Sequence, residues 1–245
     1  MRLQAAALTH RGRIRNHNED AAYADAWDRL AVVCDGMGGH AGGHIASQLA
    51  VETIVASLSS LRGAAWADEE RVVKAVQEAV FAANDRILAR ARVDATLSDM
   101  GTTIVLGAFM PDRVVTAYVG DSRIYRISGR EIAQVSEDHS LVAERIRAGL
   151  LDPDSEEARL LSNIVTRALG MEQITVDMAV EDLAPGDTYL LCTDGLHDLV
   201  REAEMLRIVQ GASTLERACV ELVELALHRG GHDNVTVALV RALAE

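Results

Sequence analysis

The sequence predicts an α+β fold with largely antiparallel sheets, formed by one domain over residues 1–245. Strand-like and helical segments come in blocks along the chain rather than in strict alternation, which favours antiparallel sheets over a parallel βαβ arrangement. The 245 residues are 49% hydrophobic but only 3% aromatic, so aliphatic side chains must fill a sizeable core. We find no internal repeat, low-complexity tract or linker that would divide the chain.

The first half of the chain predicts two strands and two helices. Leu3–Thr9 alternates weakly and predicts a strand, and the continuous apolar run Leu30–Cys34 predicts a buried strand. A glycine-dense loop, Asp35–Gly43, leads into a predicted helix over Ile45–Leu61. The clearest helix is Asp68–Val93, which has acids in its first turn and apolar residues at spacings of three and four.

The middle of the chain predicts four strands in a meander, with turns at Pro111-Asp112 and Gly129-Arg130. The strands are Thr102–Met110, Arg113–Gly120, Ser122–Ser128 and Glu131–Ser136. Ser140–Gly149 predicts a short helix. Leu150–Leu161 is acidic, contains a proline and has no clean period, so we expect a mobile loop there, within a flap over about residues 140–170.

The last third predicts three strands and two helices. They are strands Ile174–Glu181, Thr188–Cys192 and Val235–Val240, and helices Glu202–Val209 and Leu215–Arg229. The turn Ala184-Pro185-Gly186-Asp187 separates the first two of these strands.

The charge balance restricts the class of partner. The formal charge is −13, from 37 acids against 24 bases, which disfavours nucleic acid as a partner. It suits divalent cations or a basic partner, and a merely solvated acidic surface is an open alternative. The apolar run near the N-terminus precedes Arg11 and Arg13, the reverse of a signal peptide, and no apolar stretch approaches the ~18 residues that span a bilayer. We therefore expect a soluble, cytoplasmic protein without a membrane anchor.

Three cysteines, Cys34, Cys192 and Cys219, are expected to be reduced thiols. Without a C-x-x-C spacing, zinc ligation by thiolates is not expected. Cys34 and Cys192 could approach each other at the sheet ends and respond to oxidants. The alternative is that they are small buried hydrophobic residues.

Aspartates at the ends of strand-like runs predict a site for hard cations. Asp35, Asp121 and Asp194 each follow an apolar run, and Asp233 just precedes one. Carboxylate oxygens suit Mg²⁺, Mn²⁺ and Ca²⁺. The sequence therefore indicates metal-dependent chemistry.

The glycine loop after Asp35 has competing interpretations. Residues Gly36-Met37-Gly38-Gly39-His40-Ala41 fit the G-x-G-x-x-A pattern of a dinucleotide-binding turn. Asp35 would place a carboxylate beside a pyrophosphate, however, and no second strand ends in an acid about 20 residues on. A flexible turn is another alternative. We favour a backbone that wraps close to metal ions, with the Gly36 carbonyl available as a ligand.

Four segments together resemble the metal-dependent Ser/Thr protein phosphatase family, type 2C, in its bacterial form. They are Arg15-Asn16-His17-Asn18-Glu19-Asp20, Asp35-Gly36-Met37-Gly38-Gly39-His40, Gly120-Asp121-Ser122-Arg123, and Asp194-Gly195 with Gly231-His232-Asp233-Asn234-Val235-Thr236. Asp138-His139-Ser140 and Thr166-Arg167-Ala168-Leu169-Gly170 also match. The resemblance spans nearly the whole chain. It implies a four-layer α-β-β-α sandwich, with two largely antiparallel sheets flanked by helix pairs and metals in a cleft at one end.

The resemblance also implies a role for each matching residue. Two Mn²⁺ or Mg²⁺ ions would be held by Asp20, Asp35, Asp194 and Asp233, together with the Gly36 carbonyl. Asp121 and Asp194 would offer a possible third metal site. Glu19 and Asn234 would support the ligands from behind, and Arg15 would grip the substrate phosphate. A metal-bridging hydroxide would then attack phosphorus, because two cations neutralise the phosphate dianion and acidify a shared water.

His40 is the candidate proton donor to the serine or threonine alkoxide that leaves. The alternative is that His40 only braces its loop or faces solvent. For His139 and His197 a structural role is expected, and for His232 an exposed one. Residues Ala158–Asn163 lack the His-Pro pair of many bacterial relatives, which leaves flap conformation and any flap ligand of a third metal open.

The expected activity is metal-dependent hydrolysis of phosphothreonine and phosphoserine in proteins by a monomer. The resemblance implies phosphorylated protein substrates and a cognate Ser/Thr kinase. Three alternatives stay open: a non-catalytic regulatory module on the same scaffold, a phosphatase dedicated to one partner switch, and a small-molecule phosphatase that uses the same metals.

Overall fold

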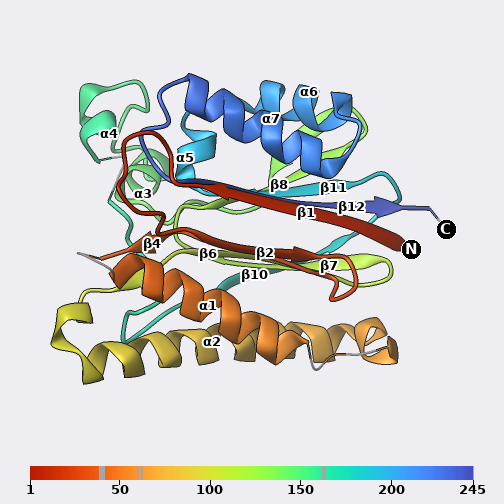
Figure 1. Ribbon diagram of the computed structural model, residues 1–245, viewed down its shortest axis with the longest axis horizontal. Coiled ribbons are helices and arrows are strands. Elements are labelled where there is room, and N and C mark those ends of the chain that lie inside the picture. Colours follow the sequence, from red (N-terminus) through yellow and green to blue (C-terminus); the bar gives the residue numbers. More distant parts are fainter. Residues whose placement is uncertain (39–41, 60, 62, 162–163, 245) are drawn as a thin grey trace.

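Two five-stranded sheets lie face to face, each covered on its outer face by helices (Figure 1). The computed structural model describes residues 1–38, 42–59, 61, 63–161 and 164–244. All strand pairs in the two sheets are antiparallel. The predicted α-β-β-α sandwich is therefore confirmed.

One sheet has the strand order β1-β12-β11-β8-β9. Its strands are β1 (Arg2–His10), β12 (Val235–Leu243), β11 (Thr188–Cys192), β8 (Arg123–Ser128) and β9 (Glu131–Gln134). The helices α6 (Glu202–Gly211) and α7 (Leu215–His228) cover its outer face, and the short α5 (Asp194–His197) packs beside them (Figure 1).

The other sheet has the strand order β10-β7-β6-β3-β2. Its strands are β10 (Asp177–Asp182), β7 (Arg113–Val119), β6 (Ile104–Phe109), β3 (Leu30–Cys34) and β2 (Ala21–Asp25). The long helices α1 (Gly42–Leu58) and α2 (Glu69–Val93) cover it. A small ribbon pairs β4 (Gly36–Met37) with β5 (Gly101–Thr102), and two 3₁₀ turns, Gly63–Ala67 and Ala95–Leu97, flank α2.

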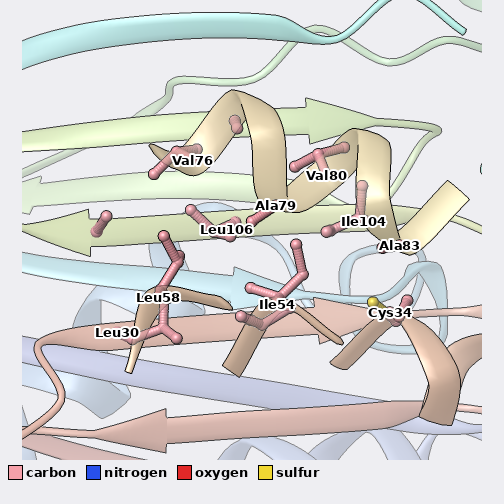
Figure 2. Close-up of a cluster of buried hydrophobic side chains, with 14 of the residues drawn as sticks. Leu30, Cys34, Ile54, Leu58, Val76, Ala79, Val80, Ala83, Ile104 and Leu106 are labelled. Atoms are coloured by element: carbon pink, nitrogen blue, oxygen red, sulfur yellow. The ribbon is translucent and has the colours of Figure 1, made fainter. Parts of the chain in front are cut away.

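Three apolar layers hold the sandwich together, and β3 shows why its sequence is a continuous apolar run. Leu30, Val32 and Cys34 pack against α1 and α2, as Figure 2 shows for Leu30 and Cys34. Ala31 and Val33 point the other way and pack against the second sheet. Because both faces of the strand are buried, no polar residue alternates with the apolar ones. Each large aliphatic side chain buried in this way contributes about 1.5–3 kcal/mol.

Helix α2 begins and packs as its sequence pattern predicts. The side chain of Asp68 caps the helix by accepting a hydrogen bond from the Arg71 amide, and two glutamates occupy the first turn. The residues at spacings of three and four that face the sheet are Val72, Val76, Val80, Ala83 and Ile87. Their burial confirms the predicted amphipathic helix.

The predicted four-strand meander is wrong, because its two hairpins belong to different sheets. Strands β6 and β7 pair in one sheet, and β8 and β9 pair in the other. The chain crosses between the sheets at Gly120, which has a φ of +110°. A Cβ at Gly120 would also lie 2.6 Å from the side chain of Thr103. Only glycine fits this tight turn, and the crossing leaves Asp121 at the sandwich end.

The flap segment is more helical than predicted. Ser140 caps α3 (Leu141–Arg147), which confirms the short helix predicted over Ser140–Gly149. Leu150–Leu161 is not wholly a loop, because α4 spans Glu156–Leu161 and Ser155 Oγ accepts a hydrogen bond from the Ala158 amide at its start. Six residues are too few for a helical period to be visible in the sequence. Helices α3 and α4 lie at the end of the sandwich opposite the two chain termini (Figure 1).

The cysteines behave as buried hydrophobic residues. Cys34 packs in the layer under α1 and α2, whereas Cys192 packs in the layer under α6 and α7. All three are free thiols. Burial raises the pKa of each thiol, to about 12 for Cys219, so the thiolates that oxidants attack are scarce. Among the helices of the described residues, none is long and apolar enough to cross a membrane.

Candidate metal centre

One cleft of about 740 Å³ collects most of the predicted site residues at one end of the sandwich. Asp35 follows β3, Asp121 follows β7, Asp194 follows β11, and Asp233 precedes β12, so both sheets supply carboxylates. The other lining residues are Arg15, Glu19, Gly36, Met37, Gly38, Thr103, Ile164, Val165 and Asn234. Asp20, just before β2, is 5% exposed and lies behind this lining.

The carboxyl groups of the site lie in a strongly negative field. The pKa of Asp20 is raised to about 7, mainly by burial and also by the charges of Asp194 and Asp233, while hydrogen bonds from Thr236 and Thr193 oppose the rise. Burial also raises the pKa of Asp35, which feels four neighbouring aspartates. The pKa of Asp121 rises to about 6, from burial and from the charge of Asp194. Such a cluster needs compensating positive charge to stay ionised at neutral pH.

Two buried carboxylate oxygens indicate that a bound cation supplies the compensating positive charge. Asp20 Oδ1 and Asp194 Oδ1 are inaccessible to solvent and have no hydrogen-bond partner among the described residues. A buried, unpaired carboxylate oxygen is costly unless a cation contacts it. In the described part of the chain no group of three or more His, Cys, Asp or Glu side chains already has ligand geometry. The donor set nevertheless suits a hard divalent cation, around which the mutually repelling carboxylates would move together.

The backbone around Asp35 and Gly36 is tightly fixed. The Asp35 carbonyl accepts hydrogen bonds from the Thr103 amide (2.8 Å) and from Thr102 Oγ1 (2.8 Å), and the Asp35 amide donates to Thr103 Oγ1 (3.0 Å). A Cβ on Gly36 would lie 2.1 Å from the Gly43 carbonyl oxygen. The first turn of α1 therefore packs directly against the backbone of Gly36, whose carbonyl is the predicted metal ligand.

Asn234 joins the N-terminal loop to the closing strand. Its side-chain oxygen accepts from the Glu19 amide at 2.8 Å, and its nitrogen donates to the carbonyls of Arg11 and His17, both at 2.9 Å. A Cβ on Gly195 would lie 1.9 Å from the Asn234 carbonyl oxygen, so α5 also packs on this residue. Asn234 thus lines the cleft and ties the loop before β2 to the start of β12.

Arg15 places the positive charge of its side chain at the cleft. Its Nη2 donates to Asp233 Oδ2 at 2.6 Å, and half of its side chain is exposed. Burial raises the pKa of Glu19, and the charge of Arg15 opposes that shift. The Arg15 guanidinium therefore lies at the cleft, paired with Asp233 and half open to solvent.

Two histidines with buried side chains hold the backbone at Gly120 and Asp121. His197 Nε2 lies 3.1 Å from the Asp121 carbonyl oxygen. His139 Nδ1 accepts from the Gly120 amide at 3.1 Å, and its Nε2 lies 2.9 Å from Asp177 Oδ2. The predicted structural role of His139 and His197 agrees with these contacts. The sequence offered no signal that they would meet the chain beside Asp121.

Two sequence-based interpretations of the glycine loop have different outcomes. The dinucleotide interpretation is wrong, because the sheets are antiparallel and Gly36–Met37 pairs with Gly101–Thr102 instead of entering a βαβ unit. His40, the candidate proton donor, lies outside the described residues, which include Gly38 and Gly42 on either side.

The described part of the flap segment closes one side of the cleft. Ile164 and Val165 line it, and Val165 forms a bridge with Ser140. Leu169, from the matching segment 166–170, bridges to Thr102, whose side chain bonds the Asp35 carbonyl. The Leu169 bridge thus ties one end of the flap segment to the chain beside Asp35, whereas the bridge between Ser140 and Val165 lies within the segment.

Known proteins resemble this chain over nearly its full length. The family described as Protein phosphatase 2C matches residues 10–229. The serine/threonine phosphatase stp of Listeria innocua is 37% identical over 242 residues, covering 97% of this chain and 95% of the relative. The protein phosphatase PhpP of Streptococcus pneumoniae is 35% identical over 246 residues, covering 97% of each. The crystal structure of the catalytic domain of PstP, in complex with two manganese ions, superposes with a TM-score of 0.89 at 34% identity and 99% coverage of each chain.

Proposed function

The chain belongs to the protein phosphatase 2C family and is a serine/threonine protein phosphatase, and from this premise we propose how its own residues act. Phosphorylated proteins are its substrates. We propose that it hydrolyses phosphothreonine and phosphoserine with Mn²⁺ or Mg²⁺ as cofactor, and that it reverses a bacterial Ser/Thr kinase. The observation that carries the metal proposal is the pair of unpartnered buried oxygens, Asp20 Oδ1 and Asp194 Oδ1.

The residues that would hold two cations are Asp20, Asp35, Asp194, Asp233 and the Gly36 carbonyl. Asp121, together with Asp194, would hold a third. When bound, such cations neutralise phosphate charge and lower the pKa of water to make a nucleophile. The raised pKa values of Asp20, Asp35 and Asp194 support this role, because a cation would keep these buried groups ionised.

Arg15 binds the substrate phosphate in this proposal. Its half-exposed guanidinium lies at a cleft otherwise dominated by carboxylates, and its planar fork matches two phosphate oxygens. Ile164 and Val165 bring apolar surface to the same cleft, where they would reduce the access of water around a bound phosphoresidue. The protonation of the leaving alkoxide is assigned to His40 as a proposal from the sequence.

We further propose that residues 1–245 form a single catalytic domain, that residues 140–170 act as its flap, and that the enzyme works as a monomer. The continuous inner apolar layer between the two sheets supports one folding unit. The bridge that ties Leu169 to Thr102, and the bridge between Ser140 and Val165 that closes the segment on itself, support a flap attached near the cleft.

The test is phosphate release from a phosphothreonine peptide, with Mn²⁺ and with EDTA. Release that requires Mn²⁺, stops with EDTA and fails in Asp194→Ala is expected. A small phosphate ester run in parallel separates a protein phosphatase from a small-molecule phosphatase, since the peptide should be strongly preferred. Mn²⁺ binding without release from any phosphopeptide would instead favour a regulatory module, and no Mn²⁺ binding would refute the metal proposal.

A further inference from the structure

Asp20 is placed by a closed ring of hydrogen bonds that comes from separate parts of the chain. Thr236 Oγ1 donates to Asp20 Oδ2 at 2.6 Å, and Thr193 Oγ1 donates to the same oxygen at 3.0 Å. Behind them, Thr9 Oγ1 lies 2.7 Å from Thr236 Oγ1, and Asn18 Nδ2 donates to Thr9 Oγ1 at 2.8 Å. The ring closes where the Asp20 amide donates to Asn18 Oδ1 at 3.3 Å.

The direction of every hydrogen bond in this ring is determined by its two ends. The Asn18 amide nitrogen can only donate, so Thr9 Oγ1 accepts from it. Thr236 Oγ1 donates its one proton to Asp20, so it can only accept from Thr9 Oγ1, whose proton therefore points to Thr236. Thr193 Oγ1 accepts from the Thr236 amide at 3.1 Å, so its proton also points to Asp20. An ionised carboxylate can only accept, which matches both donors.

The consequence is an asymmetric carboxylate. Oδ2 receives two hydroxyl protons, whereas Oδ1 receives none from the described residues and is buried. Thr193 and Thr236 are both fully buried, so water cannot substitute for either hydroxyl. If the Asp20 carboxylate rotated, both hydrogen bonds to Oδ2 would break. Oδ1, which accepts no hydrogen bond from the described residues, therefore stays the oxygen that is available to a ligand.

We propose that Thr193 and Thr236 are positioning residues that orient Asp20 for metal binding, with Thr9 and Asn18 setting the direction of the Thr236 hydroxyl. This inference rests on the proposed function, because it requires a divalent cation at Asp20. Hydrogen bonds from residues behind a metal ligand fix its orientation and charge, and their loss typically costs about 10–100-fold in metal affinity.

The central experiment compares Thr236→Val with Thr236→Ser by calorimetric titration with Mn²⁺. Valine keeps the shape but removes the hydroxyl, so the dissociation constant should rise about 10–100-fold, whereas serine should stay close to wild type. Thr193→Val and Thr193→Ser should behave in the same way. The matched control is Thr116→Val in β7, which deletes a buried hydroxyl that donates to the Ala179 carbonyl and should leave Mn²⁺ affinity unchanged.

A second variant guards against loss of folding. Thr9 is exposed, so Thr9→Val should fold, yet it frees the Thr236 hydroxyl to turn and should weaken Mn²⁺ binding by roughly two- to fivefold. Melting curves with EDTA and with Mn²⁺ give an independent readout. A positioning role reduces the rise in Tm that Mn²⁺ produces, whereas a merely structural role lowers both curves equally.

The outcomes separate the two proposals. If the wild type binds no Mn²⁺, the proposed function fails. If the wild type binds Mn²⁺ and the Thr9, Thr193 and Thr236 valine variants bind it with the same affinity, only the positioning role is overturned.

Discussion

Raising the pH should destabilise the protein once EDTA has removed divalent cations. Burial raises the pKa of Asp20 to about 7, whereas an unfolded aspartate titrates near ~3.9. Between these two values the folded state binds more protons than the unfolded state. The contribution of Asp20 to stability is therefore most favourable below pH ~4 and falls as the pH rises toward ~7.

The magnitude follows from the size of the shift. One pKa unit corresponds to about 1.4 kcal/mol, so a shift from 3.8 to about 7 gives roughly 4 kcal/mol as an upper bound. Movement of the carboxylates and entry of water would relax part of this, which leaves about 2–4 kcal/mol. About 1.5 kcal/mol of the total is already lost below pH ~5, so roughly 1–3 kcal/mol remains between pH ~5 and pH ~8, and for a chain of this size the melting temperature should fall by roughly 3–10 °C over that range.

The assay is thermal unfolding across this pH range for the wild type and Asp20→Asn, each with EDTA and with excess Mn²⁺. Burial lowers the pKa of His139, so that residue stabilises the fold as the pH rises and opposes the trend. The difference between wild type and Asp20→Asn removes this term. Mn²⁺ should flatten the wild-type curve. A wild-type Tm in EDTA that stays level or rises with pH, or an identical fall in Asp20→Asn, would refute the reasoning.

Four further substitutions test the site. Asp194→Ala should lower kcat more than about 100-fold with an unchanged circular dichroism spectrum, and near wild-type turnover would exclude it as a ligand. Arg15→Ala should raise KM for a phosphopeptide about 10–100-fold without weakening Mn²⁺ binding, and an unchanged KM would remove it from the phosphate site. Asp121→Ala should still bind two cations by calorimetry but turn over about tenfold more slowly; full activity would dismiss a functional third site. Gly36→Ala should lower stability by roughly 2–4 kcal/mol, because its Cβ would lie 2.1 Å from a backbone oxygen in α1, whereas Gly211→Ala has open space and should melt like the wild type.

Local patterns in the sequence predicted most of the elements and the charge of the site. The apolar run Leu30–Cys34 has the same bounds as β3. Asp68 caps α2 at the end where the acidic residues predicted the helix to begin. The four aspartates predicted from strand ends, Asp35, Asp121, Asp194 and Asp233, do meet in one cleft, and Asp20, which only the family resemblance indicated, lies behind its lining. These features depend on period and on residue type, which a single sequence displays directly.

Features that depend on long-range packing could not be predicted in this way. The change of sheet at Gly120 needs its positive φ and the contact with Thr103, neither of which has a periodic signature. The threonines around Asp20 are equally inconspicuous, since Thr193 and Thr236 lie 43 residues apart and meet only after β11 pairs with β12. Helix α5 is too short to be distinguished from a turn in the sequence.

The pairing of β1 with β12 bears on how the protein is made. Arg2 pairs with Leu243 and His10 with Val235, so the first strand lies against the last along its full length (Figure 1). During synthesis β1 must wait for nearly the whole chain before its partner leaves the ribosome, and loop closure over such a separation is slow. Asp20 and Asp35 are made early, but Thr236 and Asp233 arrive last. A nascent chain therefore cannot assemble the cleft until β12 has left the ribosome, and activity should appear abruptly at that point rather than grow during elongation.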